Sequence, residues 1–124
     1  MMKTQIEGTR LLEKTIVNGH AIELNEANFD GEVLNAVQPV LVQFWAGWSG
    51  SCKAMTPILE SVAKDQAVSI KFARVNVEDQ EALTEHYGVR SVPTLLIFNQ
   101  GDLLDQIVGR TTEQAVREKL EPLR

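Results

Sequence analysis

The chain has 124 residues, 44% of them hydrophobic and 23% charged, which suits one globular domain with its own core. Twelve Lys and Arg against seventeen Asp and Glu give a formal net charge of −5, which argues against a nucleic-acid or anionic-membrane binder. The single cysteine excludes an intrachain disulfide, an intrachain dithiol redox cycle and any two-cysteine metal site.

The first residues show no targeting signal and no membrane span. Residues 1–10 lack an apolar signal-peptide core, and no stretch approaches the ~20 apolar residues that cross a bilayer. A cytoplasmic location with a reduced thiol pool is therefore expected. We expect a polar N-terminal extension over residues 1–19 and one domain over residues 20–124.

From residue 20, strand-like and helix-like stretches alternate. Residues 20–24 alternate apolar and polar side chains, as a half-buried strand does. Asn25 can cap a helix that runs to about residue 37. Its inward face is expected to hold Phe29, Val33 and Val37. Residues 40–46 form an apolar run with one polar interruption, which is typical of a central strand covered on both faces.

The middle of the chain continues this alternation. Ser49 is predicted to be the N-cap of a helix that reaches about residue 64. A strand is predicted over residues 69–77. It is followed by a short helix over residues 81–87, which Gly88 ends.

The C-terminal part predicts a hairpin and a last helix. Strands over residues 94–98 and 103–108 flank a turn sequence that contains Asn and Gly. Thr111 or Thr112 is expected to cap the last helix, with Gln114 completing a capping box from Thr111. The whole order predicts an α/β fold, a mixed four- or five-stranded sheet with helices on both faces.

Two segments carry the motifs of the chain. Residues 45–53, Trp-Ala-Gly-Trp-Ser-Gly-Ser-Cys-Lys, leave the central strand and enter a helix that contains Pro57. Residues 92–94, Val-Pro-Thr, precede an apolar strand. At these positions the chain resembles the thioredoxins, which carry W-x-x-W-C-G-P-C-K at this junction and an I/V-P-T loop further on. The resemblance covers about residues 20–121 and implies the thioredoxin fold.

The chain departs from the thioredoxin pattern at the site itself. Ser49 stands where the family has its attacking cysteine, and Ser51 stands where it has the usual proline. Only the second, resolving cysteine is present, as Cys52. Gln43 replaces the acidic residue that members place behind the cysteine pair. The resemblance therefore implies an atypical site, Ser-Gly-Ser-Cys instead of Cys-Gly-Pro-Cys.

These departures remove parts of the dithiol machinery. A cysteine in the first turn of a helix has its pKa lowered by the helix dipole, whereas a serine hydroxyl does not ionise usefully there. No histidine adjacent to Ser49 is visible as its base, so an N-cap role is favoured over a nucleophilic one. The amide of Gln43 cannot relay a proton as a carboxylate does. A standard thioredoxin cycle does not follow from this sequence.

Cys52 leaves two interpretations open. It can be a small packing residue, which is how most free cysteines behave. It can also be a reactive monothiol in the first turn of the helix, beside Lys53, that forms mixed disulfides with glutathione or a partner.

The resemblance also implies a peptide groove. Trp45 is expected in the core and Trp48 on the surface, where an exposed aromatic ring favours binding. In thioredoxins a cis proline, here Pro93, presents the preceding backbone to an extended substrate peptide. Together with Val92 and Gly109, Trp48 and Pro93 are expected to outline that groove.

Three functions are compatible with these residues. The first is a thioredoxin-like protein of cell redox homeostasis that binds extended or thiol-bearing partner segments without turnover. The second is a monothiol disulfide oxidoreductase that uses Cys52 with glutathione. The third is an ordinary protein disulfide reductase whose first cysteine has been substituted to Ser49.

The two histidines, His20 and His86, are isolated in sequence and do not indicate a metal site. No cofactor is expected. The chain is expected to be a monomer with a protein partner.

Overall fold

The computed structural model describes residues 21–65 and 70–123. The predicted extension over residues 1–19 and His20 lie outside the described residues. The strands are β1 (Ile22–Glu23), β2 (Val40–Trp45), β3 (Lys71–Asn76), β4 (Thr94–Asn99) and β5 (Asp102–Val108). The helices are α2 (Gly50–Asp65), α3 (Glu81–His86) and α4 (Glu113–Leu120), with a π-helical turn η1 (Asp30–Leu34) and a 3₁₀ turn η2 (Glu121–Leu123). Within the described ranges, no helix has the length and apolar character that crossing a membrane requires.

The strands form one five-stranded mixed sheet in the order β1-β3-β2-β4-β5. The β1–β3 and β3–β2 pairs are parallel. The helical segment η1 connects β1 to β2, and α2 connects β2 to β3, so all three strands run in the same direction. The β2–β4 and β4–β5 pairs are antiparallel, and a tight turn joins the last two strands. Gln100 and Gly101 have φ angles of 52° and 88° in that turn. The predicted mixed sheet and the final hairpin are confirmed.

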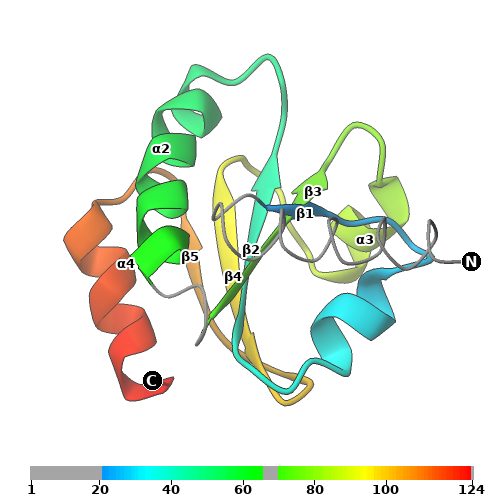
Figure 1. Ribbon diagram of the computed structural model, residues 1–124. Helices are drawn as coiled ribbons and strands as arrows, with labels where there is room; N and C mark the ends of the chain where they lie inside the picture. Colours follow the sequence, from blue (N-terminus) through cyan, green and yellow to red (C-terminus); the bar gives the residue numbers. More distant parts are fainter. Residues whose placement is uncertain (1–20, 66–69, 124) are drawn as a thin grey trace, which may run out of the picture.

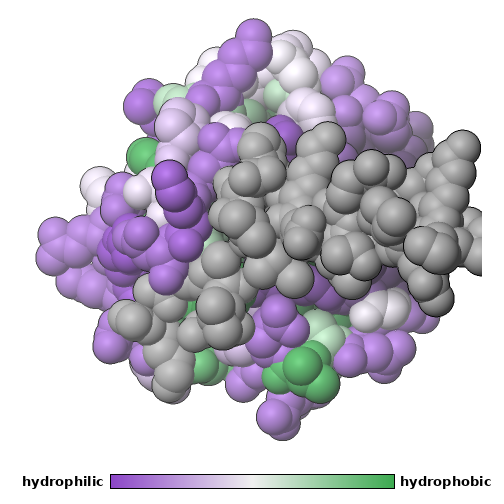
Figure 2. All heavy atoms as spheres, in the orientation of Figure 1, coloured by the Kyte–Doolittle hydropathy of each residue, from purple (hydrophilic) through white to green (hydrophobic). Residues whose placement is uncertain are grey.

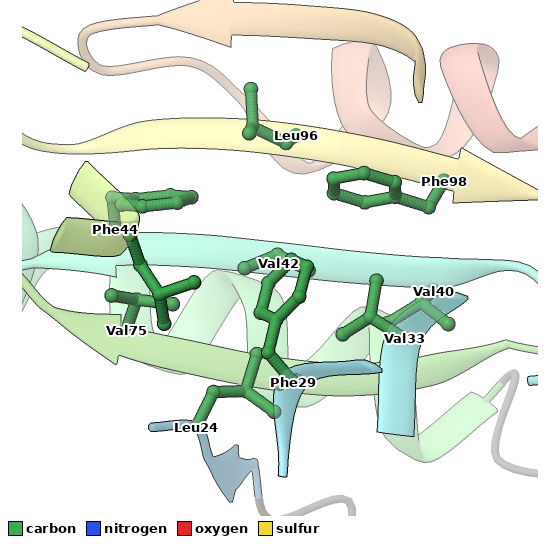
Figure 3. Packing of buried hydrophobic residues seen from close by; sticks show 11 residues of the cluster. Leu24, Phe29, Val33, Val40, Val42, Phe44, Val75, Leu96 and Phe98 are labelled. Atoms are coloured by element: carbon green, nitrogen blue, oxygen red, sulfur yellow. The ribbon is translucent and has the colours of Figure 1, made fainter. Parts of the chain in front are cut away.

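The sheet separates two apolar cores (Figure 1). On one face, η1 and α3 cover side chains from β2, β3, β4 and the residue after β1. Figure 3 gives a close view of this core. The labelled members are Leu24, Phe29, Val33, Val40, Val42, Phe44, Val75, Leu96 and Phe98. On the other face, α2 and α4 cover the second core. Its helical members are Met55, Leu59, Val62, Ala63, Val116 and Leu120. Period-two alternation along β2 and β4 sends neighbouring residues to opposite cores.

The segment between β1 and β2 differs from the predicted helix. Asn25 and Asn28 exchange hydrogen bonds, each backbone N–H donating to the other side chain's Oδ1 at 2.8 and 2.9 Å. Asn25 caps the segment as predicted, since its carbonyl also accepts the Phe29 N–H at 3.0 Å, and the helical turns end with η1. Phe29 and Val33 are buried as predicted. Val37 lies beyond η1 and is 87% exposed, so its predicted inward position is wrong.

The start of α4 also corrects one prediction. Thr112 is the N-cap, because its side-chain oxygen accepts the Ala115 N–H at 3.1 Å. The capping box from Thr111 is wrong. Gln114 instead donates from Nε2 to Glu118 Oε2 at 3.1 Å, one turn along the helix.

The surface is mainly hydrophilic over α4 and the visible part of α2 (Figure 2). Exposed large apolar side chains occur on the edge strand β5. They are Leu103, Leu104 and Val108. Acidic side chains at Asp102 and Asp105 interrupt this edge, and charge on an edge strand opposes pairing with another strand.

Candidate functional site

The site begins where β2 runs into α2. The chain turns after Ala46, whose carbonyl accepts the Ser49 N–H at 3.2 Å. Ser49 Oγ then accepts the backbone N–H of Cys52 at 3.2 Å, which satisfies a donor that the first helical turn leaves free. Ser49 is 6% exposed. The hydroxyl is thus engaged as the N-cap of α2, as the sequence predicted.

Cys52 lies in the first turn of α2 and is 2% exposed. Its backbone carbonyl accepts the Thr56 hydroxyl at 3.0 Å, so this turn is held on both sides of the cysteine. Disulfide exchange requires the attacking sulfur to reach its target, and burial restricts that access. The static structure therefore favours the packing interpretation of Cys52.

A second loop lies beside this junction. The Val92–Pro93 peptide bond is cis, as the resemblance implied. Pro93 accepts the Gly109 N–H at 2.8 Å, and Gly109 has a φ of 87°, which favours glycine. Because Thr94 pairs with Phe44 across β4 and β2, the cis-proline loop lies next to the end of β2.

The exposed indole of the site is Trp48. It is 70% exposed in the loop between β2 and α2, whereas Val92 is half-buried and Pro93 is buried. The bond between Gly109 and Pro93 joins two of the predicted groove residues directly. The same end of the molecule thus carries the four residues of the predicted peptide groove, and "groove" below denotes these four residues, Trp48, Val92, Pro93 and Gly109.

Gln43 is a buried polar residue on the sheet. It is 0% exposed and pairs with Arg74 on β3 and Leu95 on β4. Neither Nε2 nor Oε1 of its amide is hydrogen-bonded to another group in the part of the chain that is described. An unpaired buried amide lowers the free energy of unfolding by about 1–3 kcal/mol, so a stabilising role does not explain Gln43.

Sequence reasoning missed a stacked pair beside Gln43. The guanidinium carbon of Arg74 lies 4.1 Å from the ring centroid of Trp45, a cation–π contact. Arg74 Nη1 also contacts Glu23 Oε2 at 3.3 Å, which connects β3 to β1. Trp45 is half-buried, less than its predicted core position implies. Alternation along each strand assigns alternate residues to opposite faces, but the register of β2 against β3 is what brings Trp45 and Arg74 to the same face.

Glu23 gives a pH-dependent prediction. Partial burial raises the pKa of its carboxyl above 4.5, while Arg74 and Trp45 oppose this rise and Asp79 adds a little to it. A carboxyl with a raised pKa stabilises the fold at pH values below its unfolded pKa, and this contribution is lost as the pH rises through the folded pKa.

Relative to Glu23→Gln, we therefore expect the wild type to lose unfolding free energy as the pH rises above 4.5. Denaturant titrations of both proteins across that range measure the difference. A midpoint for the Glu23 carboxyl at or below 4.5, followed by carbon NMR, contradicts the prediction.

The remaining candidate residues do not form a second site. His86 is exposed and stacks edge-on against Tyr87, with ring centroids 4.6 Å apart. Among residues 21–65 and 70–123, no group of three or more His, Cys, Asp and Glu side chains is arranged to hold a metal ion.

Comparison with known proteins agrees with this geometry. The family profile for thioredoxin matches residues 20–122. The chain is 36% identical to a thioredoxin of Porphyra purpurea over 98 residues, which cover 79% of this chain and 92% of the relative. It is 36% identical to thioredoxin 1 of a Nostoc species over 101 residues, 82% of this chain and 94% of the relative. A chloroplastic M-type thioredoxin of Zea mays is 41% identical over 85 residues, 68% of this chain and 51% of that protein. With a cis proline beside the strand-to-helix junction and this similarity, the chain belongs to the thioredoxin family of redox proteins.

Proposed function

We propose that this chain is a thioredoxin-family binding protein that holds extended or thiol-bearing segments of a protein partner without dithiol turnover of its own. The contrast between the engaged or buried reactive groups and the exposed indole carries the proposal. The Ser49 hydroxyl is used as a helix cap and the only thiol, Cys52, is 2% exposed, while Trp48 is 70% exposed beside the cis-proline loop.

The chemistry of disulfide reduction explains why turnover is not proposed. A thiolate must attack one sulfur of the partner disulfide, and a second thiol must then displace the partner from the mixed disulfide. Ser49 supplies no thiolate, and a chain with one cysteine has no second thiol. Gln43, at the position of the family's buried acid, offers no carboxylate to accept the proton.

The groove does not depend on that chemistry. The bond from Gly109 N–H to the Pro93 carbonyl fixes the cis-proline loop against the end of β5. Binding by strand addition uses backbone groups for affinity and an aromatic neighbour as an anchor. Both elements are retained without a nucleophile.

Replacing Trp48 by Ala tests the groove. Because an exposed aromatic anchor loses its contact area when truncated, we expect affinity for an extended peptide to fall at least about tenfold. The melting temperature should hardly change, since the side chain is largely in solvent. Isothermal titration with the same peptide measures the loss. Leu104→Ala, which removes an apolar side chain 51% exposed on β5, is the matched control. Equal affinity of the wild type and the Trp48 variant contradicts the groove.

The second candidate function is a monothiol oxidoreductase. The observation in its favour is the place of Cys52 in the first turn of α2, where the positive end of the helix dipole favours an anionic group. Its thiolate would attack a partner disulfide, release one partner thiolate and form a mixed disulfide. A glutathione thiolate would then displace the partner and leave Cys52 glutathionylated, and a second glutathione would free it as glutathione disulfide.

Alkylation of Cys52 separates the two functions. Because the thiol is buried, we expect iodoacetamide to modify the native protein at least about a hundredfold more slowly than the protein in denaturant. Mass spectrometry over time gives both rates at matched pH. Native labelling as fast as denatured labelling, with an apparent pKa well below about 8.5, favours the monothiol enzyme instead.

A further inference from the structure

Three basic residues flank, along the chain, the segments that form the site. Lys53 follows Cys52 in the first turn of α2, Arg90 precedes the cis-proline loop, and Arg110 follows Gly109. All three are exposed. They stand out in a chain whose formal net charge is −5.

Two hydrogen bonds place Arg110 between the other elements of the groove. Gly109 N–H donates to the Pro93 carbonyl at 2.8 Å, which fixes the residue before Arg110 on the cis-proline loop. Thr111 N–H contacts Met55 Sδ at 3.5 Å, which fixes the residue after Arg110 on the first turns of α2. The backbone of Arg110 therefore connects the loop that carries Arg90 to the helix that carries Lys53.

These cations are not neutralised within the described part of the chain. The ion pairs found there leave out Lys53, Arg90 and Arg110. The acidic residue nearest to Arg110 in sequence is Glu113. Its Oε2 is already paired with Nη2 of Arg117 at 2.8 Å. The N-terminus of α2 adds the positive end of a 16-residue helix at the same place.

Acidic residues lie at the other side of the site. Glu78 and Asp79 follow β3 and are exposed. Asp79 N–H donates to the carbonyl of Asn76 at 3.1 Å, which keeps Asp79 at the end of β3. These acidic residues therefore follow β3 on one side of β2, whereas the three basic residues belong to segments next to β4, β5 and the start of α2.

We propose that the basic side of the groove selects acidic partner segments. This inference rests on the proposed peptide binding. It assigns the chemistry of the partner, which is an extended segment with Asp or Glu on the side that meets Arg90, Arg110 and Lys53. Opposite charges across an interface raise the association rate and discriminate between partners, and they do so less as salt rises.

The test uses two synthetic extended peptides that differ only by Glu in one and Gln in the other, each with a central S-methylcysteine. We expect the Glu peptide to bind more tightly, and its advantage to shrink between low and high salt. Arg90→Gln and Arg110→Gln should each weaken the Glu peptide about two- to fivefold and leave the Gln peptide nearly unchanged. Lys53→Gln should act in the same way.

Lys64→Gln is the matched control, because it removes one exposed cation from the same helix at its far end. It should change neither peptide's affinity. Equal binding of both peptides, or equal effects of the Lys53 and Lys64 variants, overturns the charge selection and leaves the groove in place. If neither peptide binds the unchanged protein, the proposed function fails as well.

Discussion

Replacing Ser49 by Cys is expected to give the chain an oxidisable dithiol that reduces protein disulfides slowly. We expect this reduction to become fast only when Gln43 is also replaced by Asp. Residues three apart at a helix start are about 5–6 Å apart at Cβ, so small adjustments allow a disulfide between positions 49 and 52. The new thiolate takes the place of the Ser49 oxygen that accepts the Cys52 N–H, and that contact and the helix dipole lower its pKa.

The second substitution addresses proton transfer. Gln43 is fully buried and its amide makes no hydrogen bond to the described protein groups. A positioned carboxylate that accepts and returns a proton contributes about 10²–10⁴-fold to a rate. We therefore expect the double variant to reduce a protein disulfide, with dithiothreitol as electron donor, at least about a hundredfold faster than Ser49→Cys alone.

Turnover of insulin disulfides measures both rates, with the unchanged protein as background. Ser49→Cys combined with Cys52→Ser has one thiol and serves as the control for simple thiol reactivity. Equal rates for the single and double variants would show that the neutral residue at position 43 does not limit the chemistry. A Ser49→Cys protein that folds and oxidises but never turns over would instead contradict the expected dithiol activity.

Truncating Phe98 to Ala is expected to lower the free energy of unfolding by about 3–5 kcal/mol. The side chain is 1% exposed, and its ring packs edge-on against Phe29 and Tyr87, with centroids 5.9 and 5.5 Å away. The substitution removes the apolar area and leaves a cavity that the rigid sheet cannot close. Because a domain of this kind is stabilised by only about 5–15 kcal/mol, the variant approaches marginal stability.

Urea denaturation of both proteins measures this loss. Leu104→Ala is the control for removal of an apolar side chain from the same hairpin, and its 51% exposure predicts a change within about 0.5 kcal/mol. A loss below about 1 kcal/mol for Phe98→Ala would contradict the packing described for this core.

Most of the fold was accessible from the sequence because its elements obey simple periodicities. β2 and β4 are apolar runs in the interior of the sheet, and Ser49 caps α2 by the rule that predicted it. The helix before β2 was overestimated, since Val37 follows a short π-helical turn and faces solvent. Apolar spacing alone could not show where that turn ends.

The residues of the candidate site could be named from the sequence, but their burial and their contacts could not. The order of motifs indicated Trp48 and the cis proline, which the structure places at one end of the sheet. The exposure of Cys52 depends on how α2 packs, which no local pattern encodes. The stacking of Arg74 on Trp45 likewise requires the register of β2 against β3. Such properties arise from tertiary packing, and a single sequence carries no direct signal for them.

The separation of the two cores by the sheet has a consequence for how this chain can vary. Gln43 faces the α2 side, while its neighbours Val42 and Phe44 belong to the core under η1 and α3. A change of chemistry at the α2 side therefore leaves the packing of the opposite core untouched. Substitutions of reactive groups on the α2 side therefore leave the contacts of the opposite core in place.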